Sequence, residues 1–244
     1  IAAAAFWGTR FDRNPMDAET ALKFSKALRD IESHQESLRV MQQTASRYQQ
    51  DPDVLLEFGK ALIANERAHE AVRPIEQAIS LGKNSDWSAY SALGVAYDMT
   101  NRHIEAREQY DRALSSAPDP AKVLNNKGLS YALSGWHQRA EMTLCEATQE
   151  GGTSRIRQNY ALVLALGGDT IEAERLARSD LPPQVADGNV AYFQRLVSGP
   201  AYWGELRADQ IDVPDFGDAP QTISTSAMDQ PVAEPVKKAP PVEA

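Results

Sequence analysis

The sequence has very little cysteine, no long apolar stretch and fewer basic than acidic residues. Cys145 is the only cysteine in 244 residues, which excludes a disulfide framework and a four-cysteine zinc site. The longest apolar candidate, residues 160–166, is far shorter than the roughly 20 residues that a membrane-spanning helix needs. Lysine and arginine number 25 against 34 acidic residues, a net charge of -9, which disfavours nucleic acid as the main partner.

The two ends of the chain differ in composition from its middle. Residues 1–7 are small and apolar with no basic stretch before them, so we interpret residues 1–17 as an N-terminal leader, either the tail of an export signal or part of the mature chain. Residues 200–244 hold seven of the 14 prolines, with eight acidic and three basic residues. This composition buries too little apolar surface to offset its ordering entropy and predicts a disordered tail. Its candidate docking points are Tyr202, Trp203, Leu206 and Phe216.

Internal repetition dominates the residues between these ends. In the clearest copy, Leu93, Gly94 and Tyr97 share one helix face, and Ala106 and Tyr110 share a face of a second helix. The small residue near the start of each second helix recurs at steps of 34, 35, 34 and 33 residues. These positions are Ser37, Ala71, Ala106, Ala140 and Ala173.

A two-helix unit of this period resembles the tetratricopeptide repeat. The resemblance implies an all-α fold, a right-handed superhelix of about five helix pairs within a domain of residues 18–199. After Pro182 and Pro183, a further amphipathic helix at residues 185–197 is expected to seal the open end. Its sealing residues would be Val190, Phe193, Leu196 and Val197. Pro74 falls inside a predicted second helix, where it should kink or shorten that helix.

No pattern in the sequence predicts catalysis, a metal site or a cofactor. The histidines fall one per repeat, at His34, His69, His103 and His137, and side chains of repeats about 8–10 Å apart seldom converge on one zinc ion. Cys145 lies beside Leu144 in a second helix, and we interpret it as a packed side chain rather than a nucleophile. The glycine pairs at 151–152 and 167–168 follow no strand and lack the lysine of a phosphate loop. We therefore expect a protein that is not an enzyme.

The concave side of such a superhelix is lined by the first helix of each pair, and a protein partner is expected to bind there. By register, the first-helix side chains that face away from their own second helix are largely apolar. Ten of them are candidate partner-binding residues: Lys26, Leu56, Lys60, Ile63, Val95, Met99, Asn125, Leu129, Leu133 and Leu162. This surface suits an amphipathic helix or an extended apolar peptide, with Lys26, Arg29 and Lys60 pairing with an acidic segment of it.

The apolar residues of the first helices are also accounted for in two ways that need no bound partner. First helices packed between neighbouring repeats need two apolar faces, which is the favoured interpretation of residues 54–64 and 160–166. Alternatively, the chain's own Phe6, Trp7 and Phe11 fill the groove, since these aromatic side chains would otherwise be exposed.

The last repeat carries a more specific resemblance. The segment RQNYALVLALGG at 157–168, the residues that follow it to Pro183, and NVAYF at 189–193 resemble the TadD proteins of the Tad (Flp) pilus assembly system of Gram-negative bacteria. The resemblance implies a non-enzymatic factor, periplasmic or associated with the outer membrane, that helps the pilus secretin or other pilus components to assemble. A lipid anchor would require a cysteine upstream of Ile1. A general tetratricopeptide adaptor for another envelope or cytosolic complex is the alternative.

Overall fold

The computed structural model describes residues 1–179 and 181–198, with side chains through Gln194. The predicted tail and its four docking residues lie outside this part of the chain. Ten helices form five pairs, as the 34-residue period predicts. The first helices are α2 (Ala18–Arg29), α4 (Pro52–Ala64), α6 (Trp87–Asp98), α8 (Pro120–Leu133) and α10 (Ser154–Gly167). The second helices are α3 (His34–Arg47), α5 (Ala68–Ala78), α7 (His103–Leu114), α9 (His137–Gln149) and α11 (Thr170–Ala177).

Every first helix begins at a side-chain cap. Aspartates at 17, 51, 86 and 119 and a threonine at 153 each accept a hydrogen bond from a backbone N–H in the first turn of the following helix. Such caps satisfy N–H groups that have no partner inside the helix and stabilise it by about 1 kcal/mol. The recurring cap therefore fixes where each repeat starts.

The turn inside each pair is also repeated. One residue in every turn adopts a positive φ, between 60° and 96°, and the next residue donates its N–H to a carbonyl five residues earlier, as Arg67 does to Leu62 at 2.9 Å. This geometry ends a helix in a left-handed residue, which glycine adopts most readily. The positive-φ residues are Glu32, Glu66, Asn101, Gly135 and Gly168.

Glycines of the first helices set the contact within three pairs. A Cβ added to Gly94 would lie 2.5 Å from the ring of Tyr110, and one added to Gly128 would lie 2.6 Å from Leu144 Cγ. Gly59 meets Ile75 in the same way. The large side chain of each second helix thus sits directly against the backbone of the first. In the fifth pair the sizes are exchanged, with Leu162 on the first helix and Ala177 at the corresponding place on the second.

Pro74, which was predicted to kink or shorten its helix, lies inside α5. Helix α5 continues through Pro74 to Ala78, and a short π-helical segment, η1 (Ile79–Lys83), follows it. Within this segment, Gly82 departs from helical geometry, with a φ of 134°. A proline removes one backbone hydrogen bond, and here the packing of Ile75 and Ala78, both fully buried, keeps the helix intact.

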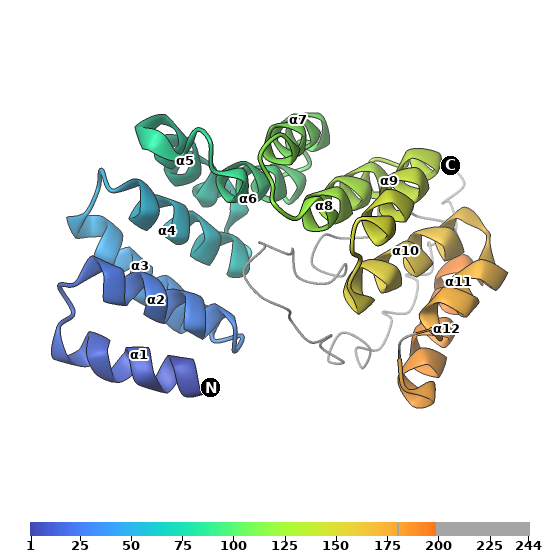
Figure 1. The fold of residues 1–244 in the computed structure, drawn as a ribbon, viewed down its shortest axis with the longest axis horizontal. Coiled ribbons are helices and arrows are strands. Elements are labelled where there is room, and N and C mark those ends of the chain that lie inside the picture. Colours follow the sequence, from blue (N-terminus) through green and yellow to red (C-terminus); the bar gives the residue numbers. More distant parts are fainter. Residues whose placement is uncertain (180, 199–244) are drawn as a thin grey trace, which may run out of the picture.

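Helices at both ends complete the stack (Figure 1). Helix α1 (Ala2–Arg13), which sequence patterns identify only as a leader, packs on α2 and places Phe11 against Phe24, with ring centroids 5.6 Å apart. Phe11 and Trp7 therefore cover the N-terminal end of the core, whereas Phe6 is 52% exposed. Helix α12 (Pro183–Ser198) packs on α10 and α11, and its Val190 and Phe193 are buried there as predicted. Leu196 and Val197 lie beyond the described side chains.

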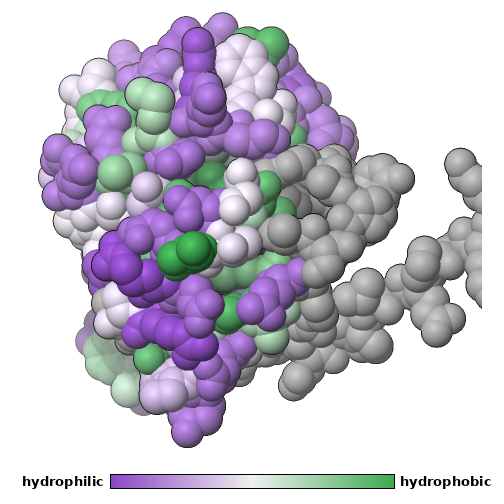
Figure 2. All heavy atoms as spheres, turned by 90° about the vertical axis from the view of Figure 1, so that its right-hand side faces the viewer, coloured by the Kyte–Doolittle hydropathy of each residue, from purple (hydrophilic) through white to green (hydrophobic). Residues whose placement is uncertain are grey.

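The helices follow one another along an arc from α1 to α12, with α5 and α7 on its outer side (Figure 1). Seen from the C-terminal end, hydrophilic residues predominate on the uncovered surface and hydrophobic ones are scattered (Figure 2). A polar outer face is what a terminal cap of a repeat array needs in order to stay in water.

Candidate partner-binding surface

The first helices form one continuous layer, which we call the inner layer: α2, α4, α6, α8 and α10. Successive members touch each other, and each second helix packs on the first helices of its own pair and of the next. All five repeats therefore contribute to one continuous surface, the kind of extended surface on which repeat proteins bind their partners. It is therefore the candidate site for a partner.

All ten predicted partner-binding residues lie on the inner layer or at the end of one of its helices, but they differ in exposure. Lys26 is exposed, and Met99 and Leu133 are half-buried. The other seven expose less than a tenth of their surface: Leu56, Lys60, Ile63, Val95, Asn125, Leu129 and Leu162. Their partner-binding role stays a prediction.

Several of the buried candidates belong to hydrophobic clusters that cross the repeats. Leu56, Ile63 and Val95 are part of the largest cluster, against which Met99 packs. Leu129 packs with Leu133 and Leu166 in a separate small cluster. Inter-repeat packing thus accounts for much of the apolar character of these helices, as expected for first helices that lie between neighbouring repeats.

Arg29 was predicted to pair with an acidic segment of a bound partner, but in the structure it pairs with a residue of the fold itself. Its guanidinium donates to both carboxylate oxygens of Glu57, at 2.9 and 3.0 Å, and only 3% of the residue is exposed. Ser25 Oγ also donates to Glu57, at 2.9 Å. Because a bidentate pair fixes both side chains, Arg29 joins α2 to α4 and is not placed to meet an acidic guest.

Amide side chains also join α8 to α10 and α10 to α12. Asn159 Nδ2 donates to Asn125 Oδ1 at 2.9 Å, and Asn189 Nδ2 donates to Gln158 Oε1 at 2.8 Å. Asn125 is in the predicted set, whereas Asn159 and Asn189 are not. The 34-residue spacing of Asn125 and Asn159 is the sequence signal that would have found the first pair.

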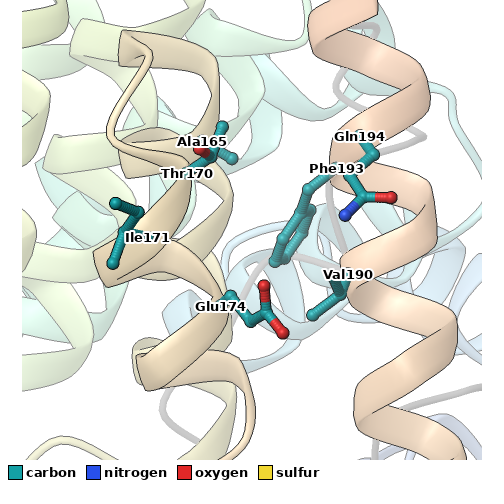
Figure 3. A pocket seen from close by; sticks show the side chains of 7 residues that line it. All are labelled: Ala165, Thr170, Ile171, Glu174, Val190, Phe193 and Gln194. Carbon is teal, nitrogen blue, oxygen red and sulfur yellow. The ribbon is translucent and has the colours of Figure 1, made fainter.

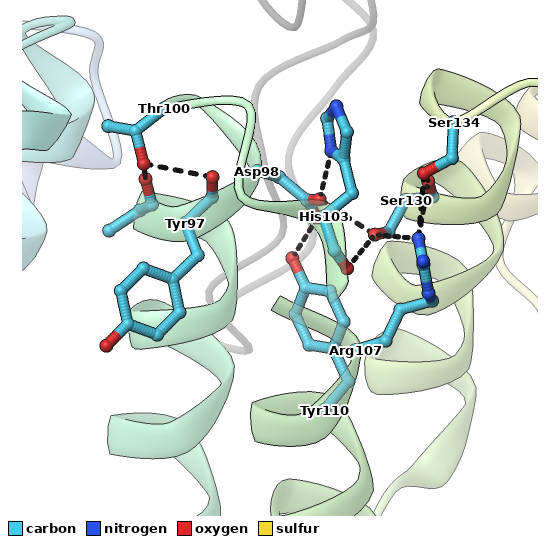
Figure 4. A network of polar contacts seen from close by, with 9 residues as sticks. Tyr97, Asp98, Thr100, His103, Arg107, Tyr110, Ser130 and Ser134 are labelled. Atoms are coloured by element: carbon cyan, nitrogen blue, oxygen red, sulfur yellow. Dashed lines mark hydrogen bonds and ion pairs between the residues drawn. The ribbon is translucent and has the colours of Figure 1, made fainter. Parts of the chain in front are cut away.

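A polar network connects the third and fourth pairs around Asp98 (Figure 4). Its carboxylate accepts from Tyr110 Oη at 2.9 Å and Ser130 Oγ at 2.7 Å, and His103 Nδ1 lies 2.8 Å away. Burial raises the pKa of the Asp98 carboxyl, against the opposing effect of these hydrogen bonds. Asp98 is 7% exposed, and its carboxylate is engaged by these three partners.

A small pocket lies between α10, α11 and α12 (Figure 3). It has a volume of about 420 Å³, and the side chains of Phe193 and Val190 face Glu174 across it. The other lining residues are Ala165, Thr170, Ile171 and Gln194. Glu174 accepts a hydrogen bond from Arg178 Nε at 2.9 Å in an ion pair at the surface.

In the described part of the chain, the histidine, cysteine and acidic side chains give no geometric basis for a metal site. The described residues contain no group of three or more histidine, cysteine, aspartate or glutamate side chains that could hold a metal ion. The histidines stand at or next to the start of successive second helices, as the period predicts. Over residues 1–179 and 181–198, no helix has the length and apolar content needed to cross a membrane.

Comparison with known proteins identifies the repeat. A tetratricopeptide repeat family model matches residues 56–119 and 104–156. No curated protein matches the sequence significantly. The chain is similar in structure to TTC0263, a thermophilic TPR protein of Thermus thermophilus, with 19% identity, a TM-score of 0.64, and 73% of this chain and 99% of that chain covered.

Two further solved structures show the same likeness. MamA AMB-1 has 19% identity and a TM-score of 0.51 over 61% of this chain and 88% of that one. A chain of the APC/C hetero-tetramer Cut9-Hcn1 has 11% identity and a TM-score of 0.60 over 79% of this chain and 35% of that one. Identities this low show the fold alone. Together with the five helix pairs and their 34-residue register, they show that the described chain folds as a tetratricopeptide-repeat superhelix, an architecture suited to protein-binding scaffolds and adaptors.

Proposed function

We propose that this protein is a non-enzymatic scaffold that binds a segment of a protein partner along its inner layer. The observation that carries the proposal is the continuity of that layer, in which α2, α4, α6, α8 and α10 touch in succession. A surface built from five repeats offers an extended segment many contacts at once.

More specifically, we propose a role in assembling a Tad (Flp) pilus, with the secretin or another pilus-assembly protein as the partner. Support comes from the resemblance of residues 157–183 and 189–193 to TadD proteins. Most of the described residues in these segments lie in α10, α11 and α12, and these helices pack on one another. The proposal implies a periplasmic or outer-membrane-associated location in a Gram-negative bacterium. A general adaptor in another envelope or cytosolic complex would use the same surface for another partner.

The test is capture of purified pilus secretin by the full chain and by charge variants. Met99→Glu and Leu133→Glu introduce a charge at half-buried places on the inner layer. Met142→Glu is the matched control, because Met142 lies on the second helix α9 and is 72% exposed. Leu129→Glu is less suitable, since burying a charge at an 8% exposed residue would disturb folding itself.

We expect the unmodified chain and Met142→Glu to capture the secretin, and the two inner-layer variants to lose at least tenfold in affinity with unchanged circular dichroism. Equal capture by all four chains would refute the inner layer as the site. If the unmodified chain does not bind secretin but binds another envelope protein through the same residues, the pilus assignment fails and the general adaptor stands.

A further inference from the structure

The third residue of each second helix follows a pattern that one repeat breaks. In α3, α5, α7 and α11 this residue is a glutamate, and each glutamate forms an ion pair with an arginine three residues away. A carboxylate suits this place, because the first turn of a helix carries partial positive charge. The four residues are Glu36, Glu70, Glu105 and Glu172.

Helix α9 departs from this pattern at two positions. Its third residue is Arg139, and its first turn contains no acidic residue. Three residues earlier, where the second and third pairs have Arg67 and Arg102, the fourth pair has Trp136. The arginine opposes the helix dipole, and the tryptophan takes the place of its neighbours' ion-pair partner. A local rule kept by the other four repeats and broken in one points to a function of that one.

The turn between α8 and α9 holds Trp136 in a fixed place. Gly135 has a φ of 75°, and the backbone N–H of Trp136 donates to the carbonyl of Tyr131 at 2.9 Å. The indole ring stacks on the ring of Tyr131, with centroids 6.1 Å apart and an interplanar angle of 21°. Trp136 is nevertheless 48% exposed. The turn therefore presents a flat apolar surface to the outside.

Two arginines from neighbouring second helices flank this aromatic pair. Arg107 of α7 lies with its Cζ 4.8 Å from the ring centroid of Tyr131, and Arg139 of α9 lies 4.6 Å from that of Trp136. Arg107 also donates to Ser134 Oγ at 2.8 Å, which fixes it at the end of α8 (Figure 4). We call the group formed by Arg107, Tyr131, Trp136 and Arg139 the aromatic edge.

Neither arginine of the aromatic edge is neutralised by a carboxylate. Within residues 1–179 and 181–198, Arg107 and Arg139 form no ion pair, although Glu108 and Glu141 lie on the same two helices. Arg139 is also exposed. Stacking on a ring fixes the plane of a guanidinium and leaves the N–H groups at its edge for a carboxylate that approaches in that plane.

Arg102 provides the internal comparison, one repeat earlier. Its guanidinium also stacks on an aromatic ring, that of Tyr97, at 4.1 Å from the centroid. Its charge, however, is paired with Glu105 at 3.0 Å. The chain thus supplies the carboxylate itself in the third pair, whereas Arg139 occupies the place of that glutamate in the fourth. The carboxylate that complements the aromatic edge has to come from another molecule.

We propose that the aromatic edge is a docking site at which a protein partner places an aspartate or glutamate side chain against Arg139 and a large apolar side chain on Trp136. Tryptophan, tyrosine and arginine are the residues most enriched where protein interfaces gain their binding energy. Because Trp136 stands on an exposed turn, its covering requires a ligand with a surface of its own, as a protein segment has. The site lies outside the inner layer and does not depend on binding there.

The experiment probes an array of random nonapeptides with the labelled full-length chain and with two variants, Arg139→Gln and Trp136→Ala. We expect a set of peptides that bind the unmodified chain to lose at least about tenfold in signal with both variants. This set should be enriched in an aspartate or glutamate next to a large apolar residue. Circular dichroism should show the same helix content in all three chains, since both altered residues are exposed.

The matched control is Arg102→Gln, because Arg102 stacks on a ring in the same way but has its own carboxylate partner. This variant should keep the peptides that Arg139→Gln loses. Arg139→Glu restores the residue type of the other four second helices, so its fold should be unharmed. It should reverse the preference and select peptides with a lysine or arginine beside the apolar residue.

Three results would overturn the proposal: Arg139→Gln loses no peptide, the lost peptides are not enriched in acidic residues, or Arg102→Gln loses the same set. Binding of anionic phospholipid vesicles through Trp136 and Arg139, with no acidic peptide selected, would assign the aromatic edge to a lipid surface instead. Peptides lost with Met99→Glu but kept with Arg139→Gln report on the inner layer, so the outcome for the proposed function is read separately.

Discussion

At the scale of single residues, Gly59, Gly94 and Gly128 matter to stability because each lies directly against a large side chain of its second helix. Tyr110 is 1% exposed, and its hydroxyl is bound to Asp98 at 2.9 Å, so its ring cannot move away from the backbone of Gly94. Gly94 therefore provides space that no other residue can provide. The same contact explains why a glycine persists within a helix, where alanine is favoured by about 1 kcal/mol.

We predict that Gly94→Ala destabilises the protein, against the helix propensity of alanine. The new Cβ would lie 2.5–2.8 Å from three atoms of the Tyr110 ring, and overpacking of this kind costs about 1–3 kcal/mol. Thermal unfolding followed by circular dichroism measures the effect. Gly167→Ala is the control, because no atom lies within 4 Å of its added Cβ, and it should be neutral or slightly stabilising. A Gly94→Ala chain as stable as the unmodified one would show that the ring relaxes freely.

At the scale of helices, the repeat pattern predicted most of the fold. The spacing of the small residues indicated five pairs, and the apolar stripe at 185–197 indicated the capping helix. Helix α1 was missed because its seven small and aromatic opening residues carry no repeat signal, and only its contact with Phe24 reveals a structural role. Pro74 was predicted to kink or shorten its helix, and α5 continues through it to Ala78, because tertiary packing outweighs the local loss of a hydrogen bond.

The candidate site was predictable in its helices but not in its polar contacts. Register alone placed the ten candidates on the inner layer or at its helix ends. It did not show that Arg29 pairs with Glu57 from the next repeat, because 28 residues separate them and no local pattern connects them. Nor did it show that Asp98 is buried by Tyr110 and Ser130, since that burial depends on how two neighbouring repeats meet.

The pair formed by Arg29 and Glu57 should matter to the junction of the first two repeats. We predict that Glu57→Ala destabilises the protein by about 3–5 kcal/mol, because it leaves a guanidinium that is 3% exposed without its bidentate partner. Replacing both residues, as Arg29→Met with Glu57→Leu, should cost considerably less, since no buried charge is then left behind. Urea unfolding of Arg29→Met, Glu57→Leu and the double variant forms the cycle that measures this coupling. Strictly additive losses would contradict it.

At the scale of the whole molecule, the repeats behave as a chain of neighbours. Each helix pair contacts the pairs before and after it, so stability is a sum of repeat terms and junction terms rather than of one global core. The largest hydrophobic cluster spans the N-terminal and central repeats from Phe11 to Val123, and the cluster at α10–α12 is separate from it. A destabilising substitution at one end should therefore unfold the repeats at that end and leave those at the other end folded.

We predict that Phe193→Asp opens the C-terminal repeat alone. Phe193 is 7% exposed in the cluster with Leu162 and Val190, and loss of a buried phenylalanine costs about 3–5 kcal/mol. Native-state hydrogen exchange should show amides of α10 and α11 exchanging at least about a hundredfold faster, since about 1.4 kcal/mol corresponds to tenfold, while amides of α2–α5 keep their rates. Ala191→Asp, an exposed position on the same helix, should leave all rates unchanged. Faster exchange spread evenly over every helix would instead mean that the array unfolds as one cooperative unit, in which case the junction between the two clusters is far stronger than their separation suggests.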